Sequence, residues 1–121
     1  MRQICLAVAL LVSVFSHTAR CQEYDIFLLL GQSNMAGRGF LPEAVPVDFS
    51  RMRVLRNGLW TPAFRPVNPD RGFSGVNLAE SFAEAYAAAH DTEVGIIPCA
   101  DGGTSMEQWM PGEVLYDHAV F

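Results

Sequence analysis

Two short segments of the sequence contain residue types that suit acyl-transfer chemistry. Residues 31–35 read Gly-Gln-Ser-Asn-Met and residues 101–104 read Asp-Gly-Gly-Thr, and each segment follows an apolar run. A serine hydroxyl held exposed at a turn can attack a carbonyl carbon while nearby backbone N–H groups hold the oxyanion. Glycine at position 103 lets a substrate carbonyl approach the backbone closely. Ser33 is therefore the candidate nucleophile, although a serine that caps a turn and glycines that end a strand would give the same pattern.

Each candidate segment follows a predicted strand. Residues 25–30 and 94–100 are short, nearly continuous apolar runs that end abruptly at polar or glycine-containing sequence. Such runs are typical of strands buried on both faces of a parallel sheet. Cys99 lies in the second run, where we expect it in the core.

A helix is predicted between the two strands. Asn77 and Glu80 have the spacing of a capping box, and an alanine-rich stretch follows them. Apolar residues that recur at helical intervals predict the buried face, which we expect to hold Leu78, Phe82, Ala85, Tyr86 and Ala89.

A strand, a helix and a strand in this order form a parallel crossover unit. Ligands of open parallel sheets bind at the carboxyl ends of the strands. If the two strands are neighbours, Ser33 and Gly103 line the same crevice.

The long connection over residues 31–75 contains a predicted hairpin. Arg53–Arg56 alternates in polarity, Asn57-Gly58 is a tight-turn dipeptide, and Leu59-Trp60 begins a return strand. The remainder is expected to be surface loop, and Leu115 to Phe121 begins another helix. A sheet with only two core strands would expose an apolar edge, so we expect the fold to be incomplete in this chain.

Residues 31–37, Gly-Gln-Ser-Asn-Met-Ala-Gly, resemble the first signature block of the SGNH hydrolases in the form of the sialate O-acetylesterase domain, shared with carbohydrate esterase family six. Gly75-Val76 and residues 96–105 with Trp109 follow the same family pattern in order and spacing. The segment 31–35 does not match the nucleophile elbow of α/β-hydrolases, because Met35 replaces its second glycine.

The resemblance implies an α/β fold, the three-layer α/β/α, flavodoxin-like SGNH-hydrolase fold with a parallel sheet. It also implies a serine esterase that removes O-acetyl groups from carbohydrate, either sialic acid or xylan-type substrates, without a cofactor or metal. The N–H groups of Ser33 and Gly103 would hold the oxyanion. The family takes a third oxyanion donor from a Gln-Gly-Glu segment and its base from an Asp-x-x-His, and this sequence has neither.

The catalytic base is therefore missing from the predicted site. His90 follows the helix, where it suits the negative helix end, and His118 falls at the start of the next helix, so we expect neither to serve as base. Without a base serine is a poor nucleophile, and we expect the 121-residue chain alone to be inactive. The alternative is a truncated or degenerate, non-catalytic carbohydrate-binding relic of the fold.

Weaker candidates surround the two segments. Gln32, Asn34, Thr104 and Trp109 are candidate substrate-binding residues, since amides can orient the turn and an aromatic ring suits the apolar face of a sugar. Turn capping by the amides and a core position for Trp109 remain open alternatives. Arg38 is either a charge at the pocket edge or a surface residue. A phosphate-binding loop over Gly31 to Gly39 is disfavoured, because the sequence has no lysine and its glycine spacing differs.

The first 21 residues resemble an export signal. Met1-Arg2 is positive, Ile4 to Phe15 is almost entirely apolar, and cleavage is expected after Cys21. We expect a secreted protein, extracellular or periplasmic, with residues 22–121 forming the N-terminal part of a sialate O-acetylesterase-like SGNH hydrolase domain. The apolar run is too short for a membrane span. Its removal leaves six arginines against thirteen acidic residues, a net charge of −7, which argues against a nucleic acid partner.

Overall fold

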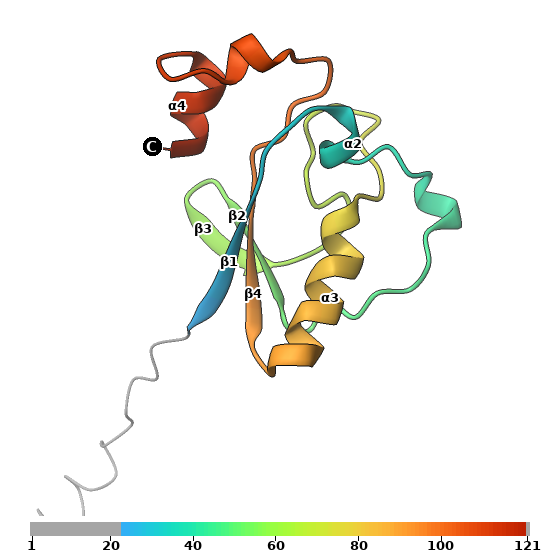
Figure 1. Cartoon of the computed structure of the whole chain (residues 1–121). Helices are drawn as coiled ribbons and strands as arrows, with labels where there is room; N and C mark the ends of the chain where they lie inside the picture. Colours follow the sequence, from blue (N-terminus) through green and yellow to red (C-terminus); the bar gives the residue numbers. More distant parts are fainter. Residues whose placement is uncertain (1–22, 121) are drawn as a thin grey trace, which may run out of the picture.

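A computed structural model of the protein describes residues 23–120 (Figure 1). The predicted signal peptide, residues 1–21, lies outside the described residues and stays a prediction, which N-terminal sequencing of the mature protein would test. No helix within residues 23–120 has the length and apolar character needed to cross a membrane.

The described residues form a four-stranded sheet in the order β1-β4-β2-β3. The strands are β1 (Tyr24–Leu29), β2 (Met52–Arg56), β3 (Leu59–Pro62) and β4 (Glu93–Pro98). β4 lies parallel to both β1 and β2, whereas β2 and β3 are antiparallel. The prediction that the two apolar strands are neighbours is confirmed.

The sheet differs from the prediction in one respect. The hairpin was predicted correctly, with Asn57 and Gly58 at φ values of 49° and 75° in its turn. Its first strand, however, joins the main sheet beside β4 instead of remaining in a surface loop. The sheet is therefore mixed rather than parallel, and it has four strands rather than two. Met52 and Val54 explain the insertion, because both are fully buried against the core.

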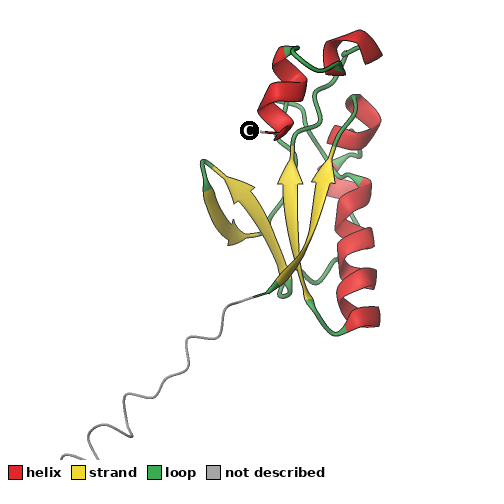
Figure 2. Cartoon of the chain, turned by 60° about the vertical axis from the view of Figure 1, so that its left-hand side comes forward, coloured by secondary structure: helices red, strands yellow, loops and turns green. Residues whose placement is uncertain are grey.

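Helix α3 (Leu78–His90) covers one face of the sheet (Figure 2). Its predicted capping box is present. The Asn77 side chain accepts a hydrogen bond from the Ala79 N–H at 3.1 Å, and Glu80 accepts one from the Asn77 N–H at 3.4 Å. Glu80 is fully buried and also binds Arg65 Nε at 2.6 Å, so it joins the helix start to the loop that follows the hairpin.

The predicted buried face of α3 was wrong. Leu78 is 55% exposed and Phe82 is 40% exposed, whereas Ala79, Ala83 and Ala87 are buried. Alanines allow the helix axis to approach the sheet closely, which rotates the larger side chains to the flank. Phe82 and Tyr86 still contact Phe27 of β1 through edge-on ring contacts, with centroids 4.8 and 4.9 Å apart. The alanines pack on a core formed by Leu29, Met52, Val54, Ala63, Val67, Val94 and Ile96.

The opposite face of the sheet is more open. Ile26 and Leu28 of β1 are exposed there, so the prediction that this strand is buried on both faces was wrong. Tyr24 packs against Trp60 with ring centroids 5.5 Å apart, and the Trp60 ring lies over Gly95, where a Cβ would come within 2.9 Å of it. Cys99, predicted in the core, is only half-buried on this side.

Short helical segments gather beyond the carboxyl ends of the strands. They are α2 (Ser33–Ala36), the 3₁₀ helix η2 (Met106–Trp109) and α4 (Val114–Val120). A further 3₁₀ helix, η1 (Leu41–Glu43), lies in the loop at the side of α3 (Figure 1). Figure 2 shows α4 above the strand ends, on the side of the sheet away from α3. Within the described residues α3 is thus the helix that packs on a face of the sheet, and α4 lies beyond the strand ends, so the second helical layer of an α/β/α arrangement is only partly present there.

Candidate active site

Ser33 is the first residue of α2 and follows the end of β1 after a short loop. The Gln32 carbonyl accepts the N–H groups of Met35 and Ala36, both at 3.0 Å, and so begins the helical turn. Ser33 is half-buried. Among the described residues, neither its hydroxyl nor its N–H donates a hydrogen bond. Both groups are therefore available to a substrate carbonyl.

Gly103 lies in the turn that follows β4. Its φ of +80° is in the region that favours glycine, and the position of an added Cβ is open space. Within residues 23–120 its N–H donates no hydrogen bond. A ligand can therefore reach this N–H without displacing a protein group.

The two loops begin side by side. Hydrogen bonds from the Cys99 N–H to the Leu29 carbonyl, 3.1 Å, and from the Asp101 N–H to the Gly31 carbonyl, 2.9 Å, continue the β1–β4 pairing beyond the strands. Ser33 and Gly103 each lie two residues past this last pair. The structure thus places both predicted residues at one edge of the sheet.

The loop that carries Ser33 is anchored by close backbone contacts. The Gly75 N–H binds the Gly37 carbonyl at 3.1 Å, and Gly39 and Val76 exchange two hydrogen bonds at 3.1 and 2.9 Å. A Cβ on Gly37 would lie 2.5 Å from Asn77 Cβ, and a Cβ on Gly75 would overlap the Gly39 carbonyl. These glycines allow the Ser33 loop to lie directly on the segment that begins α3.

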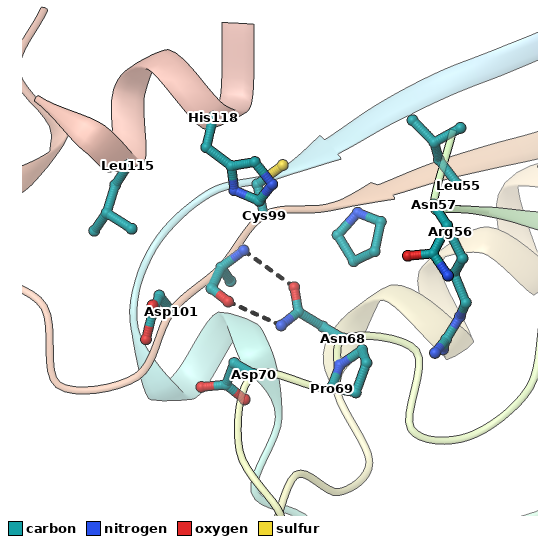
Figure 3. Close-up of a pocket in the computed structure, with 12 residues that line it drawn as sticks. Leu55, Arg56, Asn57, Asn68, Pro69, Asp70, Cys99, Asp101, Leu115 and His118 are labelled. Atoms are coloured by element: carbon teal, nitrogen blue, oxygen red, sulfur yellow. Dashed lines mark hydrogen bonds between the residues drawn. The ribbon is translucent and has the colours of Figure 1, made fainter. Parts of the chain in front are cut away.

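The loop that carries Gly103 is held instead by polar side chains from residues 68–71 (Figure 3). The Asn68 side chain donates to the Ala100 carbonyl at 2.9 Å and accepts from the Ala100 N–H at 3.1 Å. Arg71 donates to the Gly102 carbonyl at 2.9 Å and forms an ion pair with Asp101, whose Oδ1 lies 2.6 Å from Arg71 Nη2. Each of residues 100–102, which lead to Gly103, is therefore bound by a side chain from residues 68–71.

Asp70 connects the two loops. Its carboxylate accepts hydrogen bonds from Arg38 at 2.7 and 3.0 Å, from the Ser74 hydroxyl at 2.7 Å and from the Gly102 N–H at 2.8 Å. Its side chain is only 3% exposed. The Arg38 hydrogen bonds, with those from Ser74 and Gly102, hold the pKa of Asp70 well below its usual range. Asp70 therefore stays ionised at any physiological pH.

The weaker candidates divide into two pairs. Gln32 and Asn34 are exposed, and within the described residues their side chains make no hydrogen bond, so nothing shows them orienting the turn. Thr104 and Trp109 bind each other: Thr104 Oγ1 accepts from Trp109 Nε1 at 3.0 Å and donates to the Asp101 carbonyl at 2.8 Å. Thr104 thus uses its hydroxyl to close the loop that contains Gly103.

Trp109 also lines an apolar pocket of about 440 Å³ beside Gly31. The pocket lies between the end of β1 and the segments η2 and α4, and its other walls are Leu28, Leu30, Met106, Tyr116, Ala119 and Val120. The half-buried Trp109 ring therefore faces an apolar space close to the Ser33 loop.

No histidine in residues 23–120 forms a hydrogen bond with Ser33. His90 ends α3 at the opposite end of the sheet and stacks on Tyr86 with ring centroids 4.2 Å apart. His118 lines a pocket of about 380 Å³ together with Cys99 and Asp101 (Figure 3), and Ser33 is not among its walls.

Burial raises the pKa of the Cys99 thiol, which keeps it uncharged. The residues described contain no cluster of three His, Cys, Asp or Glu side chains suited to a metal ion.

Sequence reasoning missed the polar network around Asp70. It left Arg38 undecided between pocket and surface, and it did not single out Asn68, Asp70 or Arg71. The one available signal was an Asn-Pro-Asp-Arg segment in a long loop of an acidic protein. Turn chemistry explains such a segment equally well, so only the fold reveals its partners.

Comparisons with known proteins identify the family of the chain. Residues 23–121 match the family model "Carbohydrate esterase, sialic acid-specific acetylesterase". A protein of Arabidopsis thaliana named as a probable carbohydrate esterase is 33% identical over 117 residues, which cover 79% of this chain and 45% of that protein. An X-ray structure of an Arabidopsis thaliana protein superposes with a TM-score of 0.70 at 33% identity, covering 78% of this chain and 48% of the other.

The matches cover most of this chain but only about half of each relative. The family model covers all of the described residues, including both loops of the candidate site. The chain spans about half the length of the relatives that it matches. The chain therefore belongs to the carbohydrate esterase, sialic acid-specific acetylesterase family.

Proposed function

We propose that the protein is a carbohydrate O-acetylesterase with Ser33 as its nucleophile. One observation supports this most directly: the Ser33 hydroxyl and the N–H groups of Ser33 and Gly103 are unbonded within the described residues, at adjoining ends of two paired parallel strands. This is the arrangement that an acyl-transfer site needs, with a nucleophile and oxyanion donors around one carbonyl position. Family membership supports a carbohydrate as the substrate, and we propose an O-acetylated one such as sialic acid or xylan.

The proposed reaction has two steps. Ser33 Oγ attacks the acetyl carbonyl carbon and loses its proton to a base, and the carbonyl oxygen becomes an oxyanion held by the N–H groups of Ser33 and Gly103. Collapse of this intermediate releases the sugar hydroxyl, which takes the proton from the base. Water then hydrolyses the acetyl-enzyme by the same route and releases acetate. Each oxyanion donor is typically worth about 3 kcal/mol of transition-state stabilisation.

We place the base outside residues 23–120. His90 lies at the far end of the sheet, and His118 lines a different pocket. In the family that the sequence resembles, the base comes from an Asp-x-x-His near the C-terminus, and the relatives are about twice as long as this chain. We therefore expect activity from a protein that supplies that second half, and none from residues 23–121 by themselves.

A second candidate function is carbohydrate binding without catalysis. The absence of a placed base in the described residues favours it. The apolar pocket beside Gly31, with the Trp109 ring as one wall, offers a surface for the apolar face of a sugar. The two functions separate cleanly, because only the esterase releases acetate.

The product of the complete reading frame is the protein to test. Acetate release is measured from an O-acetylated sialic acid and from acetylated xylan, with a chromogenic acetyl ester as a general substrate. We expect turnover that falls at least about 10³-fold in Ser33→Ala, because the nucleophile cannot be replaced by its neighbours. Ser81→Ala is the matched control, since Ser81 is exposed on α3.

Three results would separate the possibilities. Turnover that survives Ser33→Ala unchanged contradicts the nucleophile assignment. Sugar binding without acetate release supports the non-catalytic alternative. Enzyme-like, Ser33-dependent turnover by the 121-residue chain alone would show that the base lies within it.

A further inference from the structure

Two side chains bind the backbone of Gly102, one on each of the peptide units that flank its Cα. Arg71 Nη2 donates to the Gly102 carbonyl at 2.9 Å. Asp70 Oδ2 accepts from the Gly102 N–H at 2.8 Å, which fixes the preceding peptide as well. Both polar groups of Gly102 are thus bound by consecutive residues of one loop.

The hydrogen bond from Arg71 to the Gly102 carbonyl determines the direction of the Gly103 N–H. In a trans peptide the C=O and N–H groups point in opposite directions. Fixing the Gly102 carbonyl against Arg71 therefore aims the Gly103 N–H away from Arg71, where the described residues offer it no partner. A guanidinium on the carbonyl oxygen also polarises the peptide, which strengthens the N–H as a donor.

The two glycines serve different purposes in this arrangement. A Cβ on Gly102 would overlap the Arg38 guanidinium and lie 2.9 Å from Asp70 Oδ2. Glycine at 102 thus lets the Arg38–Asp70 ion pair approach the backbone. Gly103 has open space on its Cβ side and needs glycine for its φ of +80°. Glycine at position 102 therefore leaves room for Arg38 and Asp70, and glycine at position 103 exposes its N–H to a ligand.

Arg71 and Asp70 are themselves held. Arg71 binds Asp101 Oδ1 at 2.6 Å and its neighbour's carbonyl, that of Asp70, at 2.8 Å. Asp70 is held by the paired hydrogen bonds from Arg38, whose other bond, 2.8 Å, goes to the Gly37 carbonyl in the loop of Ser33. The network therefore fixes the two candidate loops relative to each other.

We propose that Arg71 and Asp70 are positioning residues for the oxyanion donor, which aim the Gly103 N–H at the carbonyl that Ser33 attacks. The proposal rests on the proposed esterase function for its catalytic consequence. Its structural content, that Arg71 fixes the Gly102–Gly103 peptide, stands independently of turnover.

The main variant is Arg71→Met, which keeps the length of the side chain and removes its donors. Arg71 is 43% exposed, so the variant should fold. Arg51→Met is the matched control: Arg51 is 50% exposed and also binds a carbonyl, that of Ala87, and a carboxylate, that of Asp91, but at the other end of the sheet. Arg71→Lys tests whether charge alone suffices.

On the product of the complete reading frame, Arg71→Met should lower kcat about 10- to 100-fold with KM within about twofold, because the oxyanion exists only in the transition state. Arg71→Lys should recover part of kcat, and Arg51→Met should match the unmodified protein. A kcat unchanged in Arg71→Met, while Ser33→Ala abolishes turnover, overturns the positioning role and leaves the esterase function intact.

Amide hydrogen exchange on the 121-residue chain tests the structural content without turnover. The Gly102 N–H, which Asp70 binds, should exchange at least about tenfold faster in Arg71→Met because the loop is no longer fixed, with the N–H groups of Val54 and Ile96 in the sheet unchanged. Equal exchange of the Gly102 N–H in the variant and the unmodified chain would overturn the proposal even if the protein proved to be an esterase.

Discussion

The two loops of the candidate site are fixed by different physical means. The Ser33 loop lies on residues 75–77 through backbone hydrogen bonds and contacts that only glycine permits. The Gly103 loop is held by charged and amide side chains of residues 68–71. The first should be sensitive to added volume and indifferent to pH, whereas the stability of the second should depend on pH. Three substitutions test this contrast, in order of decreasing effect.

Gly75→Ala should have the largest effect. The new methyl group would overlap the Gly39 carbonyl, and backbone atoms cannot move aside as a flexible side chain can. We expect a loss of about 3 kcal/mol in the free energy of unfolding, measured by urea denaturation of the 121-residue chain. Gly72→Ala is the control, because nothing lies within 4 Å of the Cβ position there. Equal stability of the two variants would contradict the close-contact description of the Ser33 loop.

Asp70→Asn should cost about 2 kcal/mol at pH 7, because it leaves Arg38 without its buried partner. The pKa of Asp70 is lowered in the folded state, chiefly by the Arg38 hydrogen bonds. Its contribution is thus complete above the unfolded-state pKa of about 4 and is lost as the pH falls from there toward the lower folded value.

The measurement is the difference in unfolding free energy between the unmodified chain and Asp70→Asn from pH 7 down to pH 2. We expect this difference to shrink below about pH 4. Asp91→Asn, which removes the exposed partner of Arg51, should show little difference at any pH. A difference that stays constant down to pH 2 would mean that the charge of Asp70 does not hold the Gly103 loop.

Thr104→Val should have the smallest effect. It removes the hydroxyl that accepts from Trp109 Nε1 and donates to the Asp101 carbonyl, at a cost of about 1 kcal/mol. Urea denaturation followed by tryptophan fluorescence measures this cost. Thr61→Val is the control, since its hydroxyl makes a single, longer bond of 3.3 Å to the Val54 carbonyl. A larger loss in the control would contradict the role of Thr104 in closing the loop.

Local features of the fold were predictable from the sequence. The capping box of Asn77 and Glu80 and the turn at Asn57-Gly58 depend on residues within four positions of each other, and both are present. The buried face of α3 was mispredicted, because hydrophobic size suggested Leu78 and Phe82 whereas close approach to the sheet selected the alanines. Periodicity indicates that a helix has an apolar face, but it does not show which residues of that helix pack against the sheet.

The candidate site was predictable only in part. The sequence pattern indicated Ser33 and Gly103, and their roles remain predictions, although the strands that precede them are neighbours as expected. The supporting network was not predictable, because Arg38 and Asp70 lie 32 positions apart, as do Asn68 and Ala100. Pairings of that range depend on the path of a long loop, which the sequence leaves open.

The parallel pairing of β1 with β4 has a consequence for how the chain folds. Tyr24 pairs with Glu93, so the two strands lie about seventy residues apart in sequence, with the hairpin and α3 between them. The hairpin and the helix need only local contacts, whereas this pairing must close the longest loop of the described chain and carries its largest closure entropy. The ends of β1 and β4 are also the points where the Ser33 and Gly103 loops begin. A partly folded chain can therefore contain every helix and the hairpin and still lack a site, so that activity would report the completion of folding rather than its progress.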